Sequence, residues 1–229
     1  MRTALLPLAV LTLWASPAWA QGPAPRPRSL EVSVGGIALG PMDFGTSRAT
    51  LIANQSGAPE VTFFNAATEI GTGTGFDGRL AFNITRSLAV EGGLVWTRAT
   101  LESRITSDVE GIPDVTLAQD LDTYFVEASA VWHLRRLTLG GNVLPFVAGG
   151  AGYLRQLDDE KLLTDDPGQV YHAGGGVKVL FRQRPRGFIR GLGVRTDARV
   201  YFLTSGVELD DSRDRQTRWA VSGGALLRF

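Results

Sequence analysis

Cysteine is absent from this sequence of 229 residues, and histidine occurs only twice, as His133 and His172. The chain therefore relies on no disulfide, and no cysteine is available as a catalytic nucleophile. Excess charge of either sign is also absent, because 23 lysine and arginine residues balance 23 aspartate and glutamate residues. A balanced chain has no general attraction to nucleic acid, so nucleic acid is not expected as a partner.

Long apolar runs are equally scarce. The continuous run from Ala4 to Trp14 follows Arg2, and it ends before Ser16-Pro17 and the small-x-small pattern Ala18-Trp19-Ala20. It is too short for a membrane-spanning helix, and its flanks are typical of a secretory signal peptide. We predict a cleaved signal over residues 1–20, and the lack of a second long run excludes a helical membrane protein.

The rest of the chain divides into a short lead-in and one domain. Residues 21–29 contain three prolines and two arginines, a composition that favours an extended segment. Residues 30–229 are enough for a single all-β domain.

Apolar and polar residues alternate with a period of two through most of this domain, which predicts strands with two different faces. The last segment, Trp219 to Phe229, shows the pattern and closes on an aromatic residue. Each segment is close to the ~9–11 residues that a tilted transmembrane strand needs. The predicted strands are 30–39, 75–84, 88–100, 121–134, 143–154, 169–181, 191–203 and 217–229.

The predicted connections alternate in length, as in an up-and-down outer-membrane barrel with tight periplasmic turns and long external loops. The short connections are basic and contain no acid, whereas the long ones are rich in acids. A small external hairpin is expected within residues 50–64. The short connections are 85–87, 135–142 and 183–190, and the long ones are 40–74, 101–120, 155–168 and 204–216.

Alternation alone leaves open whether the apolar face points inward, as in a soluble lipocalin-like barrel, or outward to lipid. The polar face carries five acids and five bases, and charges inside a narrow barrel must be paired. We therefore predict an eight-stranded antiparallel up-and-down transmembrane β-barrel with a structural charge network in its lumen. The network residues are Glu31, Asp77, Arg79, Glu91, Glu127, Lys178, Arg195, Asp197, Arg199 and Arg228.

Aromatic residues near the predicted strand ends are suited to the two interfacial girdles of such a barrel. These residues are Trp96, Tyr124, Trp132, Tyr153, Tyr171, Tyr201 and Trp219.

Three stretches, Pro145 to Leu154, Gly174 to Leu180 and Gly193 to Phe202, resemble the family of small outer-membrane β-barrel proteins. This family includes OmpA/OmpX-type and porin-like single-domain barrels. The closing stretch, Gly223 to Phe229, is similar to the carboxy-terminal signal that the outer-membrane assembly machinery recognises. The resemblance implies an outer-membrane location, contact with lipids and lipopolysaccharide, and an assembly signal at Phe229. It implies no particular activity.

No catalytic, cofactor or metal site is predicted. Some lipid A-modifying barrels use a histidine with a serine near the external rim, and His172 alone is expected near that rim, without a readable partner. The acidic pairs of the long loops do not match a calcium-binding loop and are expected to be solvated.

The leading hypothesis is a monomeric, non-enzymatic outer-membrane barrel with a structural or surface-interaction role through long acidic external loops. The alternatives are a narrow porin-like conduit for small solutes, a lipid A-modifying enzyme and a soluble lipocalin-like ligand-binding barrel.

Overall fold

The computed structural model describes residues 24–51, 61–106, 113–139, 141–158, 168–184, 187–203 and 216–229. The predicted signal peptide and most of the lead-in lie outside the described residues. The elements are β1 (Ser29–Leu39), β2 (Met42–Leu51), β3 (Val61–Ile70), β4 (Gly73–Asn83), β5 (Leu88–Thr106), β6 (Val115–His133), η1 (Arg135–Leu137), β7 (Val143–Asp158), β8 (Gly168–Gln183), β9 (Gly191–Leu203) and β10 (Gln216–Arg228).

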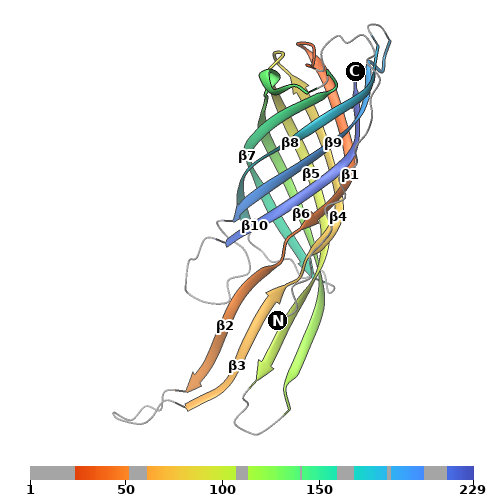
Figure 1. Cartoon of the computed structure of the whole chain (residues 1–229). Coiled ribbons are helices and arrows are strands. Elements are labelled where there is room, and N and C mark those ends of the chain that lie inside the picture. The colour runs from red at the N-terminus through yellow and green to blue at the C-terminus, as the bar shows by residue number, and fades with distance from the viewer. Residues whose placement is uncertain are drawn as a thin grey trace.

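Eight of these strands close into a barrel (Figure 1). Their hydrogen-bonded order is β5-β4-β1-β10-β9-β8-β7-β6, and pairing between β5 and β6 closes the ring. All of these pairings are antiparallel. The predicted all-β, eight-stranded antiparallel barrel is therefore confirmed.

The remaining strands, β2 and β3, leave the barrel wall and build a projecting sheet, which we call the extension (Figure 1). In it, β3 pairs with the far half of β5, from Asn65 opposite Thr106 to Ile70 opposite Leu101. The strand order of the extension is β2-β3-β5-β6.

Two of the predicted long loops are thus mostly strand. The predictions of loops at 40–74 and 101–120 are wrong for β2, β3 and the far ends of β5 and β6. The expected hairpin at 50–64 is part of a longer one, because β2 and β3 already pair at Met42 and Ile70. Residues 113–120 show no apolar alternation because both of their faces are exposed. They still form a strand because backbone hydrogen bonds hold the pairing and do not require an apolar face.

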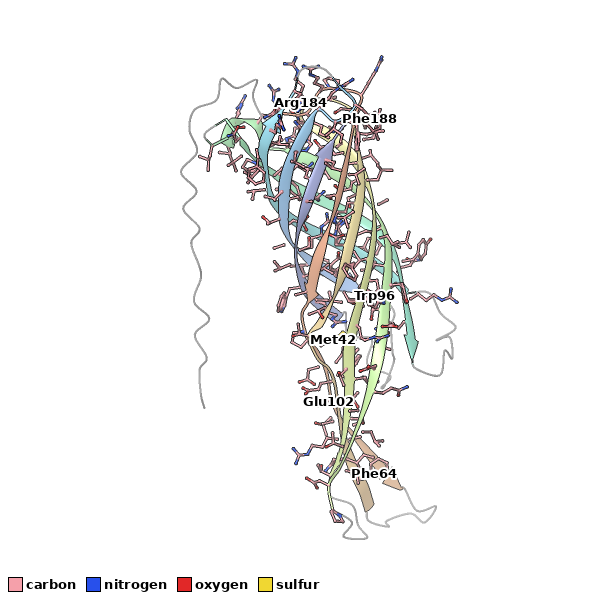
Figure 2. All side chains as sticks on the ribbon, turned by 90° about the vertical axis from the view of Figure 1, so that its right-hand side faces the viewer. Met42, Phe64, Trp96, Glu102, Arg184 and Phe188 are labelled. Carbon is pink, nitrogen blue, oxygen red and sulfur yellow. The ribbon has the colours of Figure 1, made fainter. Side chains whose placement is uncertain are left out.

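The barrel has two unlike ends. The turn end holds the described parts of the short connections, residues 84–87, 134–139, 141–142, 184 and 187–190. Phe229 is fixed there by a 2.8 Å backbone hydrogen bond to Leu30. The loop end is the opposite one, from which the extension projects. Figure 2 shows Arg184 and Phe188 at the turn end, and Trp96, Met42, Glu102 and Phe64 progressively farther from it. The acidic stretches at 159–167 and 204–215 lie outside the described residues.

The apolar face of the barrel strands points outward. On β9, Leu192 and Phe202 are 45% and 42% exposed, whereas Asp197 between them is 5% exposed. The predicted aromatic residues follow this outer face except Tyr201, which is fully buried inside the barrel. The prediction of Tyr201 in an interfacial girdle is wrong, because Tyr201 lies an even number of residues from Asp197 and therefore faces inward. Its hydroxyl donates to the carboxylate of Glu127 in the interior.

No helix of the described residues is long and apolar enough to cross a membrane.

Candidate functional site

The interior of the barrel gathers the ten residues of the predicted charge network. All ten side chains are buried, and none of the residues is more than 6% exposed. They form two groups, which we call the turn-end cluster and the central cluster. Alternation places them there: Arg195, Asp197 and Arg199 follow each other at every second position of β9, so all three face inward.

The turn-end cluster is built around Glu31 on β1. Lys178 donates to its Oε2 over 2.5 Å, and Arg228 donates to its Oε1 over 2.8 Å. The Lys178 Nζ atom also lies 3.1 Å from Nε2 of His133 and 5.4 Å from the ring centre of Phe146. One carboxylate therefore holds two cations, and the cluster carries an excess of positive charge.

The central cluster lies toward the middle of the barrel, and Glu91 is its hub. Arg195 donates to both oxygens of Glu91 over 2.5 and 3.0 Å, and Arg199 donates over 3.0 Å. Arg79 pairs with Glu91 at 3.4 Å and forms a closer ion pair with Glu127. The members are the acids Asp77, Glu91, Glu127 and Asp197 and the bases Arg79, Arg195 and Arg199.

The two clusters offset each other's charge. The central cluster has four carboxylates for three guanidinium groups, and the turn-end cluster has two cations for one carboxylate. Buried charges are stable only when they are paired and hydrogen-bonded. The two clusters together are therefore neutral, and their side chains interlock within the lumen.

Glycine makes room for these long side chains. A Cβ atom added at Gly93 would lie 2.8 Å from Cγ of Glu127 and 3.3 Å from Nη1 of Arg79. A larger residue would displace the ion pair that these two side chains form. An inward-facing glycine such as Gly93 therefore indicates a position at which long charged side chains of the network need space.

The sequence predicts His172 near the external rim, and this prediction is wrong. The residue lies among the side chains of the central cluster. Its Nε2 lies 2.9 Å from Oγ of Ser129, and its Nδ1 lies 3.5 Å from Oε2 of Glu127. Sequence reasoning missed both partners because they come from β6, two strands away. Ser129 pairs with Gly150, and Gly150 pairs with His172, so the missing side chain of Gly150 lets the two polar groups meet.

This Ser129–His172–Glu127 set resembles a nucleophile, base and orienting acid in its distances. Its surroundings differ from those of an active site. Arg199 lies 3.2 Å from the same Nε2 atom that would have to take the serine proton. Ser129 and His172 are only 4% and 3% exposed, so a substrate has no approach to the hydroxyl in this arrangement.

An apolar layer lies between the central cluster and the loop end. It fills the lumen with side chains of inward parity, and Phe125 packs on Tyr201 with ring centres 5.1 Å apart. The layer consists of Ile37, Leu39, Val95, Phe125, Leu154, Val170, Tyr201, Leu203 and Ala220. Charged clusters and apolar layer together close the barrel along its length.

Arg218 is an interior residue that the sequence interpretation missed. It lies where the barrel meets the extension, is 2% exposed, and donates to the carbonyl oxygen of Gly40 over 2.9 and 2.6 Å. Arg218 lies two and four residues before Ala220 and Ser222, which face inward, so the alternation of this strand predicts that Arg218 faces inward as well. Among the described residues, no group of three or more histidine, cysteine, aspartate or glutamate residues could hold a metal ion.

Comparison with known proteins supports the architecture. The outer membrane protein OprG from Pseudomonas aeruginosa matches with a TM-score of 0.55 at 10% identity, over 91% of this chain and 99% of OprG. Lower scores are found for Ail, the attachment invasion locus protein of Yersinia pestis (TM-score 0.45, 15% identity, 89% and 99% covered). The N-terminal β-barrel domain of P. aeruginosa OprF scores 0.38 at 13% identity, with 89% and 98% covered. No protein-family model and no curated protein matches the sequence. The OprG match shows that this chain has the fold of the small outer-membrane β-barrel proteins, as its sequence resemblance implied.

Proposed function

We propose that this protein is a non-enzymatic, monomeric outer-membrane barrel that holds its extension outside the membrane for contact with other surfaces. The observation that carries the proposal is the combination of an apolar outer wall with a filled, charge-paired interior. Lipids of the outer membrane are then its surroundings, and Phe229 serves as the signal for the assembly machinery. The fold that it shares with the outer membrane protein OprG supports this location.

The outer wall is too apolar for a protein surrounded by water. Large apolar residues are more than half exposed on several neighbouring strands, and soluble proteins rarely expose continuous patches of this kind. In a bilayer the same residues are in contact with acyl chains. They include Val34, Phe76, Leu80, Leu94, Val126 and Trp132, which are 59, 64, 54, 60, 58 and 55% exposed.

Cell fractionation tests the location. The mature protein is expected in the outer-membrane fraction, with a folded form that migrates differently from the heated form on a gel. Recovery of the protein in the soluble periplasm would contradict the proposal and would favour a lipocalin-like barrel.

Among the described residues, the extension is the part best placed to meet a partner. Residues 113–120 at its far end are exposed on both faces, and Arg104 on β5 lies 2.9 Å from Asp114, the residue before β6. In the described part of the chain, β2 pairs only with β3, so one edge of the sheet carries backbone groups that can bind an extended segment.

Surface labelling of intact cells tests this orientation. Because the chain contains no cysteine, a single Thr116→Cys variant in the extension can be compared with Arg136→Cys at the turn end. A membrane-impermeant maleimide should label position 116 and leave position 136 unlabelled until the cells are opened. The opposite pattern would show that the extension faces the periplasm.

The interior argues against a conduit. The apolar layer and the two charge clusters occupy successive levels of the lumen, and an eight-stranded barrel is just wide enough for side chains to fill. Planar-bilayer recordings of the purified protein should show no conductance. Reproducible channel openings that Leu39→Ala or Phe125→Ala enlarges would establish a pore.

The arrangement around Ser129 leads to a test of the enzyme alternative. Lipid A isolated from cells that produce the protein, the Ser129→Ala variant or neither should have the same mass spectrum. A modification that requires the native protein and disappears with Ser129→Ala would establish the catalytic role.

A further inference from the structure

We propose that the turn end carries a binding site for the phosphate group of an anionic phospholipid. The site is a cavity of about 370 Å³, which we call the arginine basin, and this inference rests on the outer-membrane location proposed above. No acidic side chain lines the basin in the part of the chain that the structure describes. Its arginine residues are Arg26, Arg86, Arg135, Arg184, Arg190 and Arg228.

These arginines come from separate parts of the chain. They lie in the segment before β1, in the turn between β4 and β5, in η1, in the connection between β8 and β9, and at the end of β10. None of these segments carries the whole group of arginines by itself. The closure of the barrel gathers them around one opening.

The backbone that carries the basin is held in place by hydrogen bonds. The amide of Arg184 donates to the carbonyl of Arg190 over 2.7 Å, and the amide of Arg190 donates to the carbonyl of Arg228 over 2.7 Å. Three of the six positions are therefore linked by backbone hydrogen bonds that extend the β8–β9–β10 sheet at the turn end. Binding does not have to order these positions first, which reduces its entropic cost.

Apart from Arg228, which belongs to the turn-end cluster, the basin arginines have no acidic side chain beside them among the residues that line the cavity. The terminal carboxylate of Phe229 can offset only one of the six arginine charges, and Glu31 on β1 already binds Lys178 and Arg228. Among the described residues, Arg135, Arg184 and Arg190 form no ion pair with a carboxylate. An anion in the basin would supply the missing negative charge, and the planar guanidinium group matches the oxygen atoms of a phosphate.

The apolar surroundings favour a lipid over a soluble phosphate compound. Phe229 lines the basin and packs edge-on against Phe188, with ring centres 5.0 Å apart. Phe188 is 82% exposed and its neighbour Ile189 is 47% exposed, and Figure 2 shows Phe188 at the same end of the barrel as Arg184. A phospholipid can therefore place its phosphate in the basin while its acyl chains follow Phe188 along the outer wall.

The test compares two triple variants with equal loss of charge. In the basin variant, Arg135, Arg184 and Arg190 are replaced by glutamine. In the control variant, Arg136, Arg155 and Arg182 are replaced by glutamine. These three arginines are also exposed but do not line the basin. Gel migration with and without heating confirms that each barrel is folded in detergent micelles.

Native mass spectrometry then measures lipid retention as phosphatidylglycerol or phosphatidylcholine is added. The native protein should retain one phosphatidylglycerol at concentrations where it retains no phosphatidylcholine. Each arginine near an anionic headgroup contributes about fivefold to the affinity, so the loss of three in the basin variant should weaken binding by about a hundredfold. The control variant should lose less than about twofold. If the basin variant does not fold, Arg184→Gln alone should lose about fivefold.

Three results would overturn the inference. Equal losses in both variants would mean that only overall charge matters, and equal retention of both lipids would mean that the site does not select anions. Displacement of phosphatidylglycerol by an equal concentration of inorganic phosphate would make it a site for soluble anions instead. Because binding is measured in micelles, these failures are distinct from recovery of the protein in the periplasm, which would refute the location.

Discussion

Replacing Arg199 with glutamine should destabilise the barrel more than any comparable change on its surface. The Arg199 side chain is 2% exposed and pairs with Glu127 at 2.9 Å, Glu91 at 3.0 Å and Asp197 at 3.3 Å. The central cluster already has more carboxylates than guanidinium groups. The substitution leaves four carboxylates, those of Asp77, Glu91, Glu127 and Asp197, with only Arg79 and Arg195.

The magnitude follows from the burial of the cluster. Removing one partner of a buried ion pair costs about 3–5 kcal/mol, because the remaining charges stay away from water without compensation. The matched control is Arg98→Gln. The Arg98 side chain is 54% exposed and pairs with Asp122 at 2.8 Å, an arrangement that contributes about 0.2–1 kcal/mol. Both changes remove one positive charge from a strand.

Urea titration of the purified barrel in lipid vesicles gives the free energy of unfolding. Tryptophan fluorescence reports the transition, because Trp132 and Trp219 lie half-exposed on the outer wall. Linear extrapolation should place Arg199→Gln about 3–5 kcal/mol below the native protein and Arg98→Gln within about 1 kcal/mol of it. A loss from Arg199→Gln no larger than that from Arg98→Gln would refute a stabilising role for the network.

Three further outcomes are expected. Gly150→Ala should lower the free energy of unfolding by about 1–3 kcal/mol or more, because its Cβ would clash with the backbone carbonyl oxygen of Ala128 and lie 2.8 Å from Cα of Ser129. Gly149→Ala, whose Cβ meets nothing closer than 3.6 Å, should be near neutral in the same titration. Phe229→Glu should reduce the amount of protein in the outer-membrane fraction without blocking export, and unchanged membrane levels would argue against an assembly signal. Joining Met42 to Ile70 by an Asn-Gly turn should remove most of β2 and β3 and leave a heat-modifiable barrel, since β5 and β6 still pair.

The barrel wall could be predicted from the sequence because each strand separates a lipid-like face from a polar one. On β9, the alternation of Leu192 to Phe202 with Arg195, Asp197 and Arg199 specifies both the strand and the direction of its side chains. A shift of one residue would place three charges on the apolar outer wall, so the pattern is strongly constrained.

The extension could not be predicted in the same way. Water surrounds both faces of residues 113–120, so Leu117 can be 59% exposed without any alternation around it. The alternation within each strand also does not specify which residues of neighbouring strands lie opposite each other. The contact of Ser129 with His172 depends on the registers of β6, β7 and β8, which place both residues opposite Gly150.

The central claim is that the apolar wall meets lipid while the extension meets water, and spin labels at single cysteines test it directly. The variants are Leu94→Cys on the outer wall, where leucine is 60% exposed, and Thr116→Cys in the extension. Oxygen concentrates in the bilayer, whereas a nickel complex stays in water. In vesicles, the label at position 94 should therefore collide more often with oxygen, and the label at position 116 should collide more often with the nickel complex. Equal collision of both labels with the nickel complex would contradict a membrane-embedded barrel.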